Sequence, residues 1–350
     1  MRLPFPIRPA VQSYLHHAYT TGILEALGCR WALANEYFSL EVRLNDIYAA
    51  VPLFLEFSPW TELSEFERGG LCSTVLHSAE QIARLTPADL TATLRELLAR
   101  GRYAELYVDE YYIPPSVRFG RTHLTHQLLV VGHDEAAGSF SGVIYHEEGR
   151  FGIAEIPAGA LCQAVAMQPR LNVFYTTDRA LREIAGGPGP TEPRLDLPRL
   201  RDGLAGFLEP ANSLPFDEAW LDHLEPGVTG FVYGRFCYEF VEASIRRAYE
   251  RGGPIDLRLT RLIWERSEVA SERAVRLAEL GVLPDEMRAP WARLAESFHR
   301  VHLIAFQHNL DRQRRRGTRR NDALPILSDA AGQDRILTEQ LLARLGRACS

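Results

Sequence analysis

Hydrophobic and polar positions change their spacing along the chain, and the change predicts an α+β half followed by a helical half. Three short runs, 106–108, 127–132 and 141–146, have the apolar content typical of β-strands. The second run is apolar without interruption, which indicates a strand buried on both faces. Residues 10–28 have apolar positions at helical spacing and end in a glycine, so we expect a helix before the strands.

Residues 71–100 predict two helical stretches that meet at Thr86 and Pro87. Thr86 is suited to an N-cap, Pro87 to the first helical position and Asp89 to the first turn. The apolar residues that follow have helical spacing: Leu90, Leu94, Leu97 and Leu98. Residues 32–44 alternate loosely and fit either a hairpin or a short helix.

The second half of the chain begins after a segment, 183–199, that is rich in glycine and proline and has no apolar period. We expect it to connect two domains, 1–185 and 200–350. Long amphipathic stretches then predict the helices of a bundle: 231–251, 257–280 and 284–316.

Composition narrows the possible chemistry. The 350 residues are enough for two domains, and 46% hydrophobic with 24% charged residues is typical of a globular protein. All 39 basic residues are arginine, which excludes a pyridoxal Schiff base and a phosphate-binding lysine. No G-x-G-x-x-G pattern follows a predicted strand, so we expect no cofactor. The net charge of −6 argues against wholesale nucleic-acid binding.

Location and metal content are predicted from what the sequence lacks. The amino terminus has no apolar signal region and no run of about 18 apolar residues occurs, so we expect a cytoplasmic protein without membrane contact. Five scattered cysteines without a C-x-x-C pair indicate reduced thiols and no metal. The histidines of the last predicted helix are interpreted as core or solvated residues: His299, His302 and His308.

The segment 106–148 carries the candidate chemistry, because two predicted strands frame a polar loop rich in tyrosine and histidine. His126 lies where the second strand begins. A side chain at that position is held by rigid backbone, which suits catalysis or ligand binding as well as a purely structural role.

Three stretches carry a resemblance to a known family: VDEYYIPPSVRFG, the core HLTHQLLVVGHD at 123–134, and the strand 141–146. They are similar to the amino-terminal domain of butirosin biosynthesis protein H-like proteins, relatives of the papain-fold C39-type cysteine peptidases of antibiotic and peptide gene clusters. The resemblance spans roughly the first half of the chain. It implies a papain-like α+β domain in which a helix cysteine attacks a thioester or amide, a strand histidine activates it and an aspartate orients the histidine.

The chain departs from that pattern at two of the three catalytic positions. His126 matches the family histidine. Where the cysteine is expected the chain has His17 and Ala18, and where the aspartate is expected it has Tyr145 and His146. Cys29 lies roughly 18 Å along the helix axis from His17. Either Cys29 is reached in another register, or covalent catalysis has been lost; the second interpretation is preferred.

A papain-like topology would still gather an acid/base group around His126, together with His16, His123 and Glu110. The residues expected to be catalytic are His126, His17, Asp109 and Tyr145. Those expected to bind substrate are His123, Tyr112, Arg118 and Arg121, with the two arginines holding an anionic group. The alternative for these arginines is a solvated loop.

These features together predict a bacterial biosynthetic protein acting on a small-molecule, carrier-bound or peptide-like intermediate by acyl transfer, cyclisation or elimination of an anionic leaving group. It would be a transferase, hydrolase or lyase. The arginine run 312–320 suggests an acidic carrier protein as partner, although a solvated helix end and, more weakly, nucleic acid remain open. The alternatives are a catalytically inactive papain-like binding subunit, or a structural subunit whose helical half forms a homodimer or heteromer.

Overall fold

The computed structural model describes residues 1–46, 51–58, 66, 70–146, 151–171, 180–188, 194–211, 213–225, 228–314 and 323–348. The chain forms two compact units. Unit 1 comprises residues 1–30 and 62–192, and unit 2 comprises residues 31–61 and 193–350. The single boundary predicted near 185–200 does not describe this division, because a strand in the early segment of unit 2 pairs with a strand far along the chain.

Unit 1 contains a six-stranded sheet in the order β3-β8-β4-β5-β6-β7, with antiparallel neighbours throughout. The three predicted strands are confirmed and are each longer than the apolar runs indicated. The strands are β3 (Cys72–His77), β4 (Tyr103–Asp109), β5 (Thr125–Asp134), β6 (Ser139–Tyr145), β7 (Phe151–Pro157) and β8 (Leu181–Gly186).

The expected connection at 183–199 is wrong for its first residues, which belong to β8 inside the sheet. Leu181 and Ile184 are buried there, between β3 and β4. Because many glycines and prolines follow it, the sequence pattern predicted a connecting segment and not this short strand. Its pairing partners lie more than 70 residues earlier, where no local signal can point to them.

The helices of unit 1 are α1 (Leu15–Ala26), α3 (Ala79–Ala83), α4 (Pro87–Ala99) and α5 (Ala158–Leu171), with a short 3-10 turn η2 (Glu110–Tyr112). The predicted start of α4 is confirmed: the Thr86 hydroxyl accepts from the Asp89 amide, and the Asp89 carboxylate accepts from the Thr86 amide. The helical stretch expected before Thr86 is instead β3 followed by the short α3. In β3 the cross-strand partners in β8 outweigh local helical preference.

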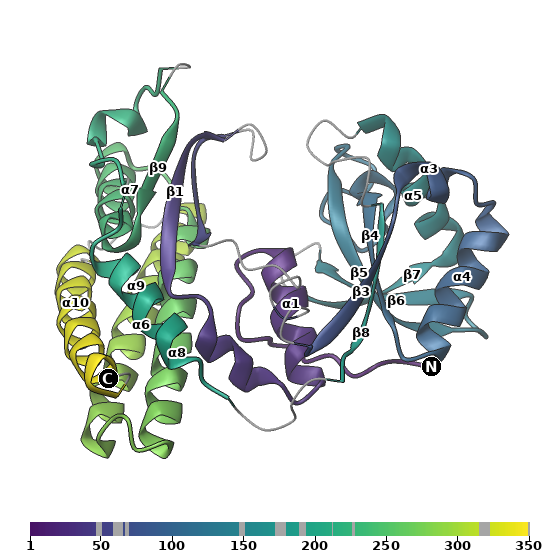
Figure 1. Ribbon diagram of the computed structural model, residues 1–350. Coiled ribbons are helices and arrows are strands. Elements are labelled where there is room, and N and C mark those ends of the chain that lie inside the picture. Colours follow the sequence, from purple (N-terminus) through teal and green to yellow (C-terminus); the bar gives the residue numbers. More distant parts are fainter. Residues whose placement is uncertain are drawn as a thin grey trace. The chain divides into compact units, whose positions relative to one another are not determined.

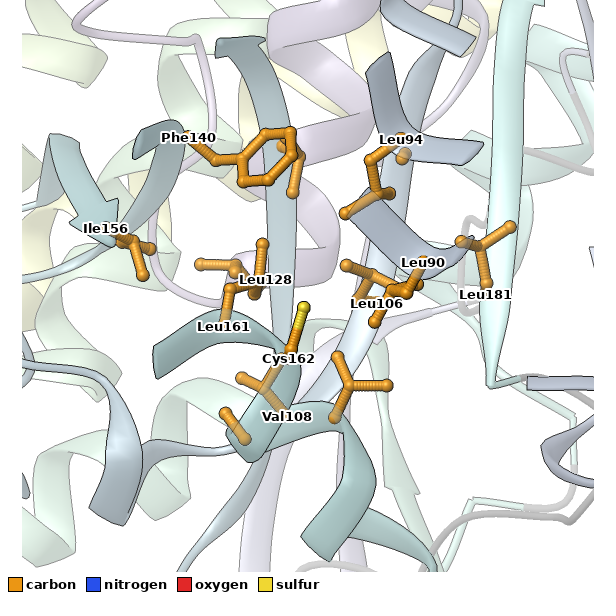
Figure 2. Close-up of a cluster of buried hydrophobic side chains, with 14 of the residues drawn as sticks. Leu90, Leu94, Leu106, Val108, Leu128, Phe140, Ile156, Leu161, Cys162 and Leu181 are labelled. Carbon is orange, nitrogen blue, oxygen red and sulfur yellow. The ribbon is translucent and has the colours of Figure 1, made fainter. Parts of the chain in front are cut away.

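One face of the sheet packs against α4 and α5 and forms the core of unit 1 (Figure 1). On the sheet side the core is formed by alternate residues of β4 and β5, including Leu106, Val108 and Leu128 (Figure 2). Leu94 of α4 and Leu161 of α5 pack on them from the helix side. The helix α1 lies on the other face, where the Tyr19 hydroxyl donates to the carbonyls of β5 and β6. The sheet therefore has a helix layer on each side.

Unit 2 combines a three-stranded antiparallel sheet, ordered β2-β1-β9, with a set of long helices. Its strands are β1 (Ser39–Asp46), β2 (Val51–Ser58) and β9 (Gly230–Tyr233). Its helices are α6 (Leu197–Leu208), α7 (Cys237–Arg251), α8 (Leu257–Glu279), α9 (Arg288–Gln313) and α10 (Ala323–Ala348). Short 3-10 turns occur at η1 (Arg30–Asn35), η3 (Glu218–Leu221), η4 (Gly234–Phe236) and η5 (Asp285–Met287).

The helical character predicted for this region is confirmed, with one correction. Residues 231–236 form β9 and η4 instead of the first turns of a helix, because β9 pairs with β1. The predicted stop after Arg251 is confirmed by Gly252, whose φ of 61° is left-handed. No helix in the described part of the chain is long and apolar enough to cross a membrane.

A buried charge network connects the elements of unit 2. Arg266 of α8 and Asp334 of α10 are both fully buried, with Arg266 Nη1 2.6 Å from Asp334 Oδ2. The Tyr238 hydroxyl donates to the same carboxylate at 2.5 Å, and Arg266 Nε donates to the Phe38 carbonyl at 2.8 Å. The guanidinium carbon lies 3.7 Å from the centre of the Phe207 ring. Every charge in this network is therefore compensated by a near neighbour.

The buried charge network predicts a large loss of stability when one of its charged residues is removed. We expect Asp334→Ala to lower the free energy of unfolding by about 3–5 kcal/mol, because Arg266 stays buried without its partner. The neighbouring Arg335–Glu339 pair is half exposed, so Glu339→Ala should cost about 0.5 kcal/mol or less. Urea unfolding followed by circular dichroism measures both, and equal losses would contradict the role given to the buried network.

Candidate functional site

The candidate site of unit 1 lies where β4 ends and β5 begins. The register pairs Val108 with His126 and Asp109 with Thr125. Because successive residues of a strand point to opposite faces, His126 lies on the same face as Val108 and Leu128. This is the face that carries α4 and α5.

His126 forms a close pair with Glu110. The distance from His126 Nδ1 to Glu110 Oε1 is 2.6 Å, and the Ser116 hydroxyl donates to the other carboxylate oxygen at 2.8 Å. Arg118 Nε lies 3.7 Å from that second oxygen. The His126 side chain is 30% exposed and the Glu110 side chain 12%. With Nδ1 occupied, Nε2 is the nitrogen left to meet a substrate.

Opposing influences act on the Glu110 carboxyl. Burial acts to raise its pKa, but the hydrogen bonds from His126 and Ser116 and the charges of His126 and Arg118 outweigh burial, so its pKa lies below the ordinary value. Glu110 is therefore ionised near neutral pH. An anionic carboxylate at Nδ1 fixes the tautomer of the imidazole and stabilises the imidazolium that forms when Nε2 takes up a proton.

A second carboxylate–histidine pair lies beside the first. Asp109 is fully buried, and His123 Nδ1 is 2.7 Å from its Oδ2. Asp109 Oδ1 accepts from the backbone amides of Tyr111 at 3.1 Å and Leu124 at 3.2 Å. The His123 ring stacks on Tyr111, with centroids 4.2 Å apart and planes 17° apart. His123 is thus firmly oriented although its side chain is 47% exposed.

The structure does not gather all of the predicted residues into one cleft. His17 is fully buried on α1, and the Tyr145 hydroxyl donates to the carbonyl of Gln12, just before that helix. Both lie on the α1 face of the sheet, whereas His126 lies on the opposite face. The expectation of a single constellation assumed the family topology, and strand alternation assigns the faces differently.

The remaining predicted residues lie in or near the loop that joins β4 to β5. Tyr112 is partly buried and packs against the core of unit 1. Arg118 approaches Glu110, and Arg121 is exposed. The loop therefore presents one arginine beside the His126 pair and a second at its surface.

The specific partner roles of Glu110 and Ser116 were not predicted from the sequence. Glu110 was expected only as one of several polar groups around the histidines. Two-residue periodicity could have assigned it to the His126 face, since it follows Val108 by two positions. Ser116 carries no such signal, because the Pro114–Pro115 loop that returns it to Glu110 has no periodicity.

The described cysteines do not supply an activated thiol at this site. Cys29 follows α1, with its Sγ 3.6 Å from the Leu27 carbonyl, and burial raises the pKa of its thiol. Cys72, Cys162 and Cys237 are buried and take part in no disulfide. Cys349 lies outside the described residues.

A histidine whose Nδ1 is bound by a carboxylate is also the arrangement found at metal ligands. Within the described residues, however, neither His123 nor His126 belongs to a group of three ligand atoms lying within 4.8 Å of one another. The observed geometry is therefore that of two oriented imidazoles with acid/base capacity.

Comparison of the chain with protein-family models and with curated proteins finds no match. Its chemistry is consequently argued from the geometry of the site.

The lowered pKa of Glu110 predicts a pH-dependent contribution to stability. The folded protein holds fewer protons at this carboxyl than the unfolded chain does, so the contribution is present above the ordinary pKa of a glutamate, about 4.3, and is lost as the pH falls through the lower folded value. We expect the wild type to be more stable than Glu110→Gln at pH 6 and the difference to shrink as the pH falls below the ordinary pKa of a glutamate. Urea unfolding across this range measures it, and a difference that does not depend on pH would contradict the ion pair.

Proposed function

We propose that this chain is a bacterial, cytoplasmic protein of secondary metabolism whose unit 1 has a papain-like fold similar to that of the butirosin H-like family. Its reaction would be acyl transfer, cyclisation or elimination of an anionic leaving group on a carrier-bound or peptide-like intermediate. The observation that carries the proposal is the His126–Glu110 pair, an oriented imidazole at the start of a central strand with its second nitrogen directed away from the carboxylate.

The proposed chemistry is general acid/base catalysis without a covalent adduct. His126 Nε2 would remove a proton from a substrate amine or hydroxyl, and Glu110 would stabilise the resulting imidazolium. The substrate nucleophile would then attack an activated carbonyl in the same bound intermediate, so that positioning replaces the missing cysteine. The raised pKa of Cys29 supports this route over a thiolate mechanism.

The fold supports the family proposal at a coarse level and departs from it in one respect. An antiparallel sheet, an amino-terminal helix on one face and a histidine at the start of a central strand all agree with a papain-like domain. In the family the helix cysteine and the strand histidine act together, whereas His126 here lies on the face away from α1. A chain that lacks the cysteine has no need to keep that alignment.

Charged groups in the same loop indicate an anionic substrate. Arg118 lies beside Glu110, and Arg121 is exposed three residues further on. Either guanidinium could hold a phosphate, sulfate or carboxylate in bidentate fashion. The acidic carrier protein expected to meet the arginine run 312–320 stays a proposal, because most of that run lies outside the described residues.

One observation favours the alternative, a binding subunit without catalytic activity. The predicted catalytic residues are divided between the two faces of the sheet. The Asp109 carboxylate already binds His123 and accepts hydrogen bonds from two backbone amides. A surface of oriented histidines, tyrosines and arginines could bind a ligand without transforming it. The two functions differ in whether removal of the His126 ring changes a rate or only a stability.

The test uses an ornithyl thioester of N-acetylcysteamine, which carries no anionic group and therefore tests the acid/base step without the arginines. Its lactamisation releases a thiol that a chromogenic disulfide detects. We expect the protein to accelerate thiol release and His126→Ala to lower the accelerated rate by about 10²- to 10⁴-fold, the usual contribution of a positioned general base. Melting temperatures are recorded for the same samples.

The matched control is His77, which forms a comparable pair elsewhere in unit 1. His77 Nε2 lies 2.6 Å from Glu183 Oε1, the side chains are 29% and 14% exposed, and an arginine also approaches the carboxylate. His77→Ala should cost similar stability and leave thiol release unchanged. If the two variants behave alike, or the wild type does not exceed the background rate, the catalytic proposal gives way to the binding subunit.

The thiols provide an independent prediction. Because Cys29 has a raised pKa and the other described cysteines are buried, iodoacetamide at neutral pH should not abolish thiol release by the protein. Cys29→Ser should keep the wild-type rate. Inactivation by alkylation that Cys29→Ser prevents would instead restore a covalent mechanism.

A further inference from the structure

A third histidine, His146, is connected to the His126 pair through Ser116, and no role of its own was predicted for it from the sequence. It follows β6 directly and forms an isolated antiparallel bridge with Ser116. Ser116 is the same residue whose hydroxyl donates to Glu110, and Glu110 in turn binds His126. One loop residue therefore contacts both the backbone of His146 and the carboxylate that orients His126.

Strand alternation assigns His146 to the face of His126. In β6, Phe140 and Ile144 belong to the core under α4 and α5, so the residue two positions after Ile144 points to the same side. The neighbouring Tyr145 points to the α1 face, where its hydroxyl reaches the Gln12 carbonyl. Of the two residues at the family's aspartate position, His146 is the one that shares a face with His126.

The strand register brings the two histidines to the same level of the sheet. In β5 and β6, Leu129 pairs with Val143, and continuing this register would set His126 opposite His146. The ladder is instead interrupted there, and Ser116 pairs with His146. Both side chains therefore lie at the same end of the sheet and on the same face, and Ser116 contacts the backbone of His146 and the carboxylate that binds His126.

Gly152 of β7 provides the space for the His146 ring. It pairs with Ile144, and a Cβ atom at this glycine would lie 2.7 Å from His146 Nε2 and 3.2 Å from Cδ2. Any side chain at residue 152 would therefore push the imidazole out of its position.

We propose that His146 is a catalytic residue, the general acid that complements His126 as the general base. The inference rests on the function proposed above. His126 takes the proton of the attacking substrate amine, whose lone pair forms the new C–N bond. As the C–S bond breaks and its electron pair goes to sulfur, protonated His146 gives its proton to the leaving thiolate. Transfer of one proton from His126 to His146 through solvent restores both groups, so no further reactant is needed.

The experiment measures thiol release from the ornithyl thioester over pH 5 to 9. We expect His146→Ala to lower the rate by about 10²-fold and to remove the decline at high pH that a required acid produces, while the rise governed by the base remains. Gly152→Ala should lower the rate in the same direction by displacing the ring. Gly159→Ala, whose new methyl group would meet nothing within 4 Å, is the control and should be unchanged.

A double variant separates a steric effect on His146 from a general loss of folding. Once the ring is absent the methyl group has room, so Gly152→Ala should cost nothing further in the His146→Ala background. Additive losses, or a rate that falls only in step with the melting temperature, would overturn the assignment.

The outcome also separates this inference from the function on which it rests. Loss of activity in His126→Ala with full activity and an unchanged pH profile in His146→Ala would overturn the role of His146 alone. Wild-type rates in both variants would overturn the proposed function as well.

Discussion

The packing of β5 against α4 and α5 is the constraint on which the candidate site depends. Leu128 and Val130 are fully buried in that core, and they determine which residues of the strand point toward it. Because the side-chain period of a strand is two, His126 must take the same side. Slipping β5 by one residue would move His126 to the α1 face and bury polar Gln127 in its place, so the apolar core also determines the chemistry at the end of the strand.

His123 of the loop and His126 of β5 are oriented by two consecutive carboxylates, Asp109 at the end of β4 and Glu110 at the start of η2. The two neighbouring carboxylates reach different imidazoles: Asp109 binds His123 and Glu110 binds His126. Each carboxylate has its remaining oxygen occupied, one by backbone amides and the other by Ser116. Preorganisation of this kind lowers the cost of holding an imidazole in one orientation for proton transfer.

Unit 2 also contains closely paired opposite charges, but there they stabilise the fold. Arg266 and Asp334 are removed from water completely, and their charges are stabilised by each other, by Tyr238 and by a backbone carbonyl. In unit 1 the corresponding pairs keep one partner exposed to solvent, as His123 and His126 do. A fully compensated buried pair specifies packing, whereas a half-exposed pair leaves a nitrogen free to exchange protons.

Local signals in the sequence were sufficient to predict α4 with its Thr86 cap, the central strand of unit 1 and the long helices of unit 2, because each depends on neighbours within a few residues. They also indicated His126 as the candidate centre. The strands β8 and β9 were not predictable, since they are stabilised by partners more than 70 residues away. Two-residue spacing from Val108 could have assigned Glu110 to the His126 face, but the hydrogen bond from Ser116 to Glu110 and the bridge between Ser116 and His146 depend on the fold alone, because a returning loop without periodicity forms both of them.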